Sequence, residues 1–164
     1  MPRPPISATN CWILTVVDAP IGSSILKATD LLTLRCRRLY WLLNSRAPNF
    51  KKLNKDDVVV FYVGGIEGGS FRGTCRLSSK PRRLPPNVKR HIIEDAEDKF
   101  DYYVNLREVE LFPSPKPLTQ IAKRLSFIKD KGRWWRNLQG GIIRIPERDF
   151  AFLRVGGTGE VLSP

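Results

Sequence analysis

The chain is poor in the residues that build metal centres and disulfide frameworks. It has one histidine, His91, and three widely spaced cysteines, Cys11, Cys36 and Cys75, none in a C-x-x-C pair. One histidine and scattered cysteines cannot supply a zinc site, so we expect neither a metal nor a cofactor. An odd number of such cysteines is typical of proteins from reducing compartments, which predicts a cytoplasmic protein without a disulfide framework.

Long apolar runs are also missing. No stretch approaches eighteen consecutive apolar residues, so we expect no membrane span. The first residues, Met-Pro-Arg-Pro-Pro, lack the apolar core of a signal peptide. A length of 164 residues with 41% hydrophobic content fits one domain with a single core. Proline and glycine distribution predicts a flexible arm over 1–9, a folded domain over 10–155 and a flexible tail over 156–164.

Acidic residues are the minority. The chain has 28 lysines and arginines against 16 aspartates and glutamates, a formal net charge of +12. Residues 35–55 contain seven basic side chains and no acid. An excess of this size favours polyanionic partners, with nucleic acid first and an anionic membrane surface second, although basic charge also serves solubility alone.

Hydrophobic patterning predicts more strands than helices. Runs of β-branched and aromatic residues bounded by turn residues predict strands over 11–17, 58–63, 70–77 and 102–112. Shorter helical patterns occupy about 23–32, 87–98, 118–124 and 146–153. Together these elements predict an α+β domain, built on a small β-barrel of about five to six strands with surrounding helices.

Tryptophans occur within basic segments. Trp134 and Trp135 lie in a C-terminal basic segment, and Trp41 lies in the basic stretch 35–55. Aromatic rings stack on bases while nearby cations meet phosphates. The candidate phosphate-binding residues are Arg35, Arg37, Arg38, Lys51, Lys52, Lys129, Lys131, Arg133 and Arg136. Asn44 and Ser45 are candidates for reading a base edge, because a pocket for an extruded base needs amide or hydroxyl groups.

Two alternatives stay open from the residues alone. All four tryptophans could be core residues, and core is the favoured interpretation for Trp12 on its apolar strand. A metal-dependent nuclease could use Glu108 and Glu110, which lie two apart on a strand, but pairing with arginines across the strands explains these residues better. A general RNA-binding module without preference for a modification is the remaining alternative.

Several motifs resemble those of the EVE domain, a PUA-like family related to YTH domains. They include Tyr40-Trp41, Gly69-Ser70-Phe71-Arg72-Gly73, and a closing signature met by Leu125, Phe127, Ile128, Lys129, Lys131, Arg133 and Trp134, which continues to Asp149-Phe150. The resemblance spans roughly residues 11–153. One departure is Thr15-Val16-Val17-Asp18, where many members have Lys-Ser-Glu-Pro, so the identity of a recognised base is not transferred.

The resemblance implies a PUA-like barrel that reads modified bases in DNA or RNA without catalysis. Trp41 would be one wall of an aromatic cage, and Trp134 would line or support the same pocket. Asn44 and Ser45 would be the neighbouring polar groups. Trp12, Phe71 and Tyr102 are the candidates for support of that pocket. The choice between DNA and RNA, the modification, the oligomeric state and any partner enzyme stay open.

Overall fold

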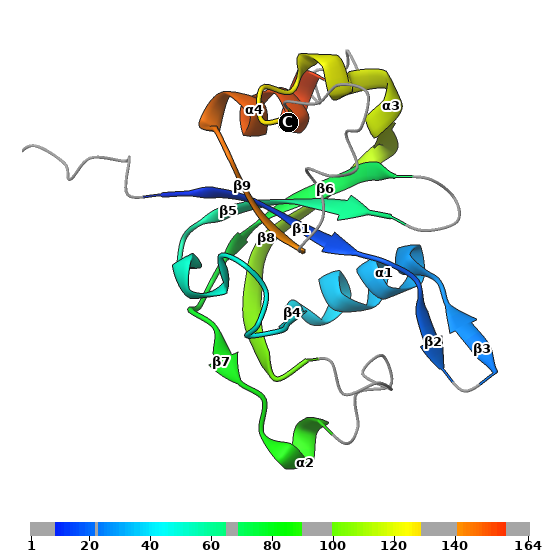
Figure 1. The fold of residues 1–164 in the computed structure, drawn as a ribbon, viewed down its shortest axis with the longest axis vertical. Helices are drawn as coiled ribbons and strands as arrows, with labels where there is room; N and C mark the ends of the chain where they lie inside the picture. Colours follow the sequence, from blue (N-terminus) through cyan, green and yellow to red (C-terminus); the bar gives the residue numbers. More distant parts are fainter. Residues whose placement is uncertain (1–8, 22, 65–68, 90–99, 129–140, 157–164) are drawn as a thin grey trace, which may run out of the picture.

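The computed structural model describes residues 9–21, 23–64, 69–89, 100–128 and 141–156. A mixed sheet curls into a half-barrel, with strand order β4-β8-β6-β5-β1-β9 and β7 paired to β8 (Figure 1). The parallel pair is β1–β5, whereas the other neighbours are antiparallel. The strands are β1 (Cys11–Val16), β4 (Tyr40–Leu43), β5 (Val58–Val63), β6 (Ser70–Leu77), β7 (Arg82–Arg83), β8 (Tyr102–Pro117) and β9 (Ile142–Ile145). The predicted α+β barrel architecture is confirmed.

The sheet is apolar on both faces. Along β1, Trp12 and Leu14 belong to one buried cluster, while Cys11 and Ile13 belong to another. This division follows from the two-residue period of a strand, which sends successive side chains to opposite faces. Strand β5, predicted over 58–63, lies between β1 and β6 and divides its side chains between the two clusters in the same way.

Helices cover the two faces separately. Helix α1 (Ala28–Arg38) contributes Leu31 and Leu32 to the first cluster. Helices α3 (Leu118–Ile121) and α4 (Glu147–Ala151) cover the second cluster, on the opposite side of the sheet in Figure 1. The smaller elements are η2 (Phe50–Lys52), α2 (Pro86–Lys89), η4 (Ala122–Arg124) and the π-helical turn η6 (Phe152–Gly156). None of the described helices is long and apolar enough to cross a membrane.

Helix α1 differs from the sequence prediction. The predicted helix over about 23–32 was wrong in its start, because strands β2 (Ala19–Ile21) and β3 (Ser24–Leu26) form a hairpin there. The helix begins at Ala28, whose backbone N–H donates to Oδ1 of Asp18 at 2.8 Å. Asp18 satisfies one of the amides that a helix N-terminus leaves without an internal partner. A residue ten positions earlier in the chain thus caps the helix.

The starts of the C-terminal elements agree better with the sequence prediction than the start of α1 does. Strand β8 begins at Tyr102 as expected, and α4 follows Pro146. The buried carboxylate of Asp149 accepts three hydrogen bonds of 2.9–3.0 Å, from the amide and hydroxyl of Ser126 and the amide of Phe127. These bonds fix the chain just before residue 129 onto α4. Of the predicted helix over 87–98, only residues 87–89 lie within the described part of the chain, where they belong to α2 (Pro86–Lys89).

Candidate nucleic-acid interface

Trp41 is a core residue rather than an open surface ring. It lies on strand β4, opposite Val104 of β8, and its side chain is 2% exposed. Its ring stacks on Phe61 with a centroid separation of 5.0 Å and an interplanar angle of 18°. The guanidinium carbon of Arg35 lies 4.6 Å from the same ring centroid. The basic stretch around Trp41 is therefore the end of α1 followed by strand β4.

A polar turn follows directly after β4. Oδ1 of Asn44 accepts a hydrogen bond from the backbone N–H of Arg46 at 2.8 Å, an Asx turn. The backbone N–H and hydroxyl of Ser45 both donate to Asp101. Among the described residues, Nδ2 of Asn44 has no hydrogen-bonding partner. Since Ser45 gives its hydroxyl proton to Asp101, its oxygen can still accept. The turn thus offers an amide donor and a hydroxyl acceptor, groups that can pair with a base edge.

The chain returns to this turn after the C-terminal basic segment. The carbonyl of Gly141 accepts a hydrogen bond from the backbone N–H of Thr15 at 3.1 Å. Nδ2 of Asn49 donates to the carbonyl of Ile142 at 3.0 Å. The end of β1, the loop that follows Ser45 and the start of β9 therefore meet. Trp134 itself lies outside the described residues, so the proposed pairing with Trp41 is untested.

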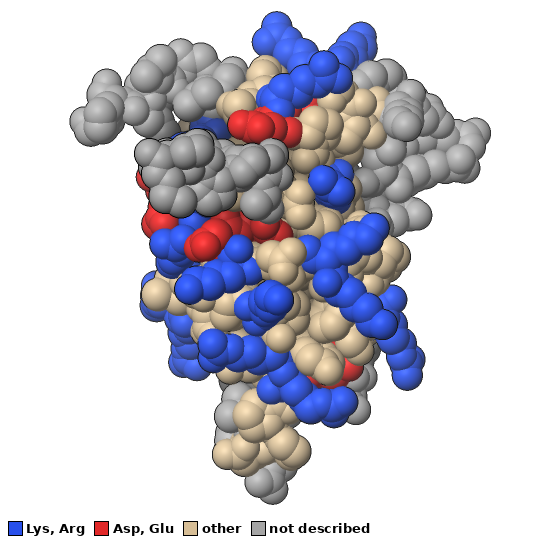
Figure 2. Space-filling view, turned by 90° about the vertical axis from the view of Figure 1, so that its left-hand side faces the viewer, with Lys and Arg blue, Asp and Glu red and all other residues tan. Residues whose placement is uncertain are grey.

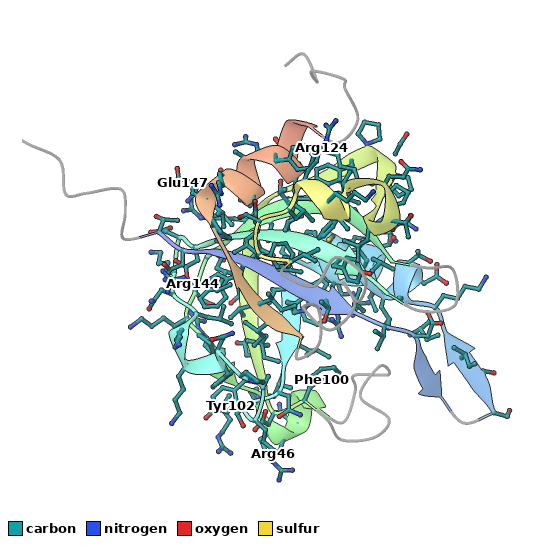
Figure 3. All side chains as sticks on the ribbon, turned by 45° about the horizontal axis from the view of Figure 1, so that its top comes forward. Arg46, Phe100, Tyr102, Arg124, Arg144 and Glu147 are labelled. Atoms are coloured by element: carbon teal, nitrogen blue, oxygen red, sulfur yellow. The ribbon has the colours of Figure 1, made fainter. Side chains whose placement is uncertain are left out.

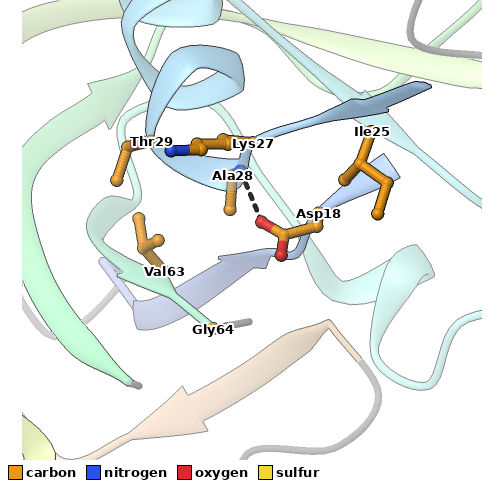
Figure 4. A pocket seen from close by; sticks show the side chains of 7 residues that line it. All are labelled: Asp18, Ile25, Lys27, Ala28, Thr29, Val63 and Gly64. Carbon is orange, nitrogen blue, oxygen red and sulfur yellow. Dashed lines mark hydrogen bonds between the residues drawn. The ribbon is translucent and has the colours of Figure 1, made fainter. Parts of the chain in front are cut away.

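A small hollow lies at the base of the β2–β3 hairpin. Its volume is about 250 Å³, and Figure 4 shows that the end of β5 and the start of α1 enclose it. The lining residues are Asp18, Ile25, Lys27, Ala28, Thr29, Val63 and Gly64. The lining contains no aromatic ring, and the carboxylate of Asp18 already caps α1. Among the described residues, this hollow therefore lacks the stacking walls of an aromatic cage.

The three candidate support residues occupy different places. Trp12 is fully buried, and its indole N–H donates to Oδ2 of Asp57 at 2.8 Å, which agrees with a core role. Phe71 packs against Tyr62 in the second cluster, whereas Trp41 belongs to the first. The structure therefore separates Phe71 from Trp41, because the strand period sends them to opposite faces of the sheet. Tyr102 is partly buried against the cluster that contains Trp41.

The candidate phosphate ligands divide into three groups. Arg35 is only 3% exposed and lies over the rings of Trp41 and Phe100, so the expectation of a surface cation fails for this residue. The exposed candidates are Arg37 and Arg38 at the end of α1 and Lys51 and Lys52 in η2. Those outside the described residues are Lys129, Lys131, Arg133 and Arg136. Figure 2 shows lysine and arginine spread across one face, over a larger area than the acidic residues cover.

The two glutamates considered as nuclease ligands, Glu108 and Glu110, do not form a metal site in the described structure. Glu108 has a φ of 53° and sits where the register between β6 and β8 shifts, so strict alternation with Glu110 is lost. Its carboxylate lies 3.1 Å from Nη1 of Arg107 and 3.8 Å from Nε of Arg76 across the strand. The predicted arginine pairing is confirmed for Glu108. Within the described part of the chain, no three His, Cys, Asp or Glu side chains form a cluster that could hold a metal.

The cysteines are unsuited to nucleophilic chemistry. All three are free and buried. Burial raises the pKa of the Cys36 thiol to about 12 and raises the pKa of Cys75 well above its ordinary value. Because the thiolate is the nucleophile, thiols with raised pKa values are unreactive at neutral pH.

Comparison with known families agrees with the motifs and the fold. The family model described as EVE domain matches residues 27–155, most of the chain. The chain belongs to the EVE domain family. The match begins after β1 and the β2–β3 hairpin, the region where the sequence departs from the family's first-strand motif. No curated protein matches the chain.

Solved structures show the same EVE fold at low sequence identity. Human THYN1 in complex with 5-methylcytosine-containing DNA superimposes with a TM-score of 0.60 at 14% identity, over 88% of this chain and 95% of that chain. A protein from Pseudomonas putida gives a TM-score of 0.58 at 17% identity, over 87% and 96%. The DUF55 domain of human thymocyte nuclear protein 1 gives a TM-score of 0.58 at 14% sequence identity, over 87% of this chain and 95% of that chain.

Sequence reasoning missed the carboxylates that shape this EVE domain. Asp101 holds Ser45 across 56 positions, and Asp57 holds Trp12 across 45. Both aspartates lie next to predicted strand starts, which is the signal that sequence offers. Their partners are set by strand pairing, which a local pattern does not reveal.

Proposed function

We propose that this EVE domain is a non-catalytic nucleic-acid-binding protein that captures a modified base. The observation that carries the proposal is the fold shared with human THYN1, whose structure contains 5-methylcytosine DNA. The net charge of +12 supports the same partner class, because counterion release on phosphate binding drives association.

The proposed base site lies where the turn after β4, the end of β1 and the start of β9 meet. Nδ2 of Asn44 donates to the base edge, and Oγ of Ser45 accepts from it. Asp101 supports this assignment, because its two hydrogen bonds fix the Ser45 hydroxyl and its backbone. A site pre-organised in this way loses less conformational entropy when the base binds.

In the proposal, Trp41 and Trp134 have different roles. Trp41 is a buried support behind the site, held by its stack on Phe61. Trp134 is the open wall on which the base stacks, a contribution of about 1–3 kcal/mol. The exposed Arg37, Arg38, Lys51 and Lys52 hold phosphates, and Lys129, Lys131, Arg133 and Arg136 are proposed for the same task.

A second candidate is a general RNA-binding module without preference for a modification. The observation that favours it is the described hollow, which has no aromatic lining. Such a module would bind through charge, with little dependence on base chemistry.

Variants of the proposed pocket separate these two functions. Binding of matched DNA and RNA oligonucleotides that carry cytosine, 5-methylcytosine, adenine or N6-methyladenine is measured for the wild type and for Trp134→Ala and Asn44→Ala. A reader loses discrimination in both variants, with affinity for the preferred base falling about fivefold or more for Trp134→Ala. The matched control is Asn54→Ala, an exposed amide whose side chain bonds only the carbonyl of Lys52 among the described residues. Equal affinities for all four bases in every protein would support the general module instead.

A further inference from the structure

An aromatic–basic surface continues from the proposed base site toward strand β7. Strand β8 runs between β4 and β7 there, and Tyr102 faces Leu43 on one side and Arg83 on the other. Residues directly opposite one another in adjacent strands share one face. Leu43 belongs to the buried core, so this row of three side chains runs from the core to the exposed Arg83.

Tyr102 joins this row to the basic helix η2. Its ring meets Phe50 edge-on, with centroids 4.9 Å apart and planes at 67°. The guanidinium carbon of Arg83 lies 5.6 Å from the centroid of the Tyr102 ring. Phe50 is the first residue of η2, so the exposed Lys51 and Lys52 follow directly. The ring contacts thus bring residues from β7, β8 and η2 to one surface.

A further exposed cation lies beside this row of side chains. Arg46 is exposed three residues after Leu43, and Figure 3 shows it at the same end of the molecule as Tyr102. Asp101, the acid next to Tyr102, is already bonded to Ser45. We name the set Arg46, Lys51, Lys52, Arg83 and Tyr102 the β7 surface.

We propose that the β7 surface binds single-stranded nucleic acid that flanks the recognised base. Arg46, Lys51 and Lys52 meet phosphates, while the guanidinium of Arg83, held over Tyr102, gives a flat platform for a base. Arginine planes are stacking partners for unpaired bases. A base within a duplex has both faces occupied by its neighbours, so a single strand fits this platform. The inference rests on the proposed nucleic-acid function and deepens it by naming the strand state.

Edge protection is the competing explanation for Arg83. Strand β7 has two residues and, among the described strands, pairs only with β8; charged side chains on such edges hinder strand-to-strand aggregation. Lysine serves that purpose as well as arginine. It lacks the planar guanidinium, however, so Arg83→Lys separates stacking from edge charge.

The test measures fluorescence anisotropy with a labelled oligothymidine of about 20 nucleotides, long enough to span more than one subsite. The variants are Arg83→Ala, Arg83→Lys and Arg46→Ala. The matched control is Arg124→Ala, an exposed arginine whose guanidinium lies 6.0 Å from the Phe152 ring centroid at the opposite end of the molecule (Figure 3). Each alanine variant removes one charge, and the control also removes a comparable ring contact.

We expect Arg83→Ala and Arg46→Ala to weaken binding about fivefold or more, against less than about twofold for Arg124→Ala. Arg83→Lys falls between the wild type and Arg83→Ala. The slope of log affinity against log salt becomes shallower by about 0.7 for each single-strand phosphate contact removed. Equal losses for Arg83→Ala and Arg124→Ala would overturn the inference, as would an equal loss with a duplex of the same length.

Measurements on the same variants distinguish failure of this inference from failure of the base-reader proposal. The ratio of affinities for modified and unmodified oligonucleotides reports on the base site, and we expect it to be unchanged by Arg83→Ala. If the wild-type ratio is one while Arg83→Ala still weakens binding selectively, the reader fails and the β7 surface stands. If the wild type discriminates but Arg83→Ala matches Arg124→Ala, the surface fails and the reader stands.

Discussion

Replacing Trp41 by alanine is expected to destabilise the fold before it alters any binding property. The side chain is 2% exposed, stacks on Phe61 and lies beneath the guanidinium of Arg35. Truncating a buried tryptophan costs about 3–5 kcal/mol of the free energy of unfolding. Losing the cation–ring contact adds about 0.5–2 kcal/mol. We therefore expect a loss of about 4 kcal/mol or more, a large part of the stability of a single domain.

Urea unfolding measures this loss directly. With an m-value of about 2 kcal/mol per molar, a loss of about 4 kcal/mol lowers the urea midpoint by about 2 M. Trp41→Phe is the matched control, since it keeps a ring against Phe61 and beneath Arg35, and we expect it to cost about 1–2 kcal/mol. A Trp41→Ala protein within about 1 kcal/mol of wild type, with base discrimination lost, would refute the core placement and restore Trp41 as an open wall of the cage.

Two further predictions concern the packing at Gly69 and the burial of Lys116. A Cβ added at Gly69 would lie 1.5 Å from the hydroxyl oxygen of Tyr62, so Gly69→Ala should displace that ring and lower the urea midpoint, while Gly64→Ala, whose nearest contact is 3.4 Å, should leave it nearly unchanged. Burial lowers the pKa of Lys116 from its ordinary 10.5. Between the lowered value and 10.5 the unfolded chain binds more protons, so stability rises with pH in that window. Lys116→Met should remove this rise, measured as the unfolding free energy of both proteins from about pH 8 upward; parallel pH profiles would contradict the assignment.

Much of the sheet could be predicted from the sequence because most of its longer strands have a clear local pattern of β-forming residues. The run Val58–Val63 consists of β-forming residues between turn residues, and β1, β6 and β8 carry similar patterns. Strand β9 was missed. Only four residues long, it follows a glycine pair, and its place is set by antiparallel pairing with β1.

Long-range contacts explain what the sequence could not predict about α1 and Trp41. The cap from Asp18 moves the start of α1 to Ala28, past a hairpin that a local pattern does not reveal. Because its sequence neighbours are basic, Trp41 was predicted to be a surface ring. The partner that buries it, Phe61, is twenty positions away on β5.

For the candidate site, the sequence indicated residue types but not the contacts that hold them. Asn44 and Ser45 do lie in an accessible polar turn, but the carboxylate that orients Ser45 comes from Asp101 at the start of β8. Arg35 was grouped with the surface cations, because a sequence does not show that a helix turns one arginine of a basic run into the core.

The central claim is that this EVE domain distinguishes a modified base from its unmodified counterpart. The most direct measurement is the affinity of the wild-type protein for pairs of DNA and RNA oligonucleotides that differ only in the modification of one base, at fixed salt. A modified base that fits the pocket gains stacking and edge contacts, so we expect at least one pair to differ by about tenfold or more. Affinities within about twofold for every pair of a broad panel would contradict the account and leave binding by charge alone.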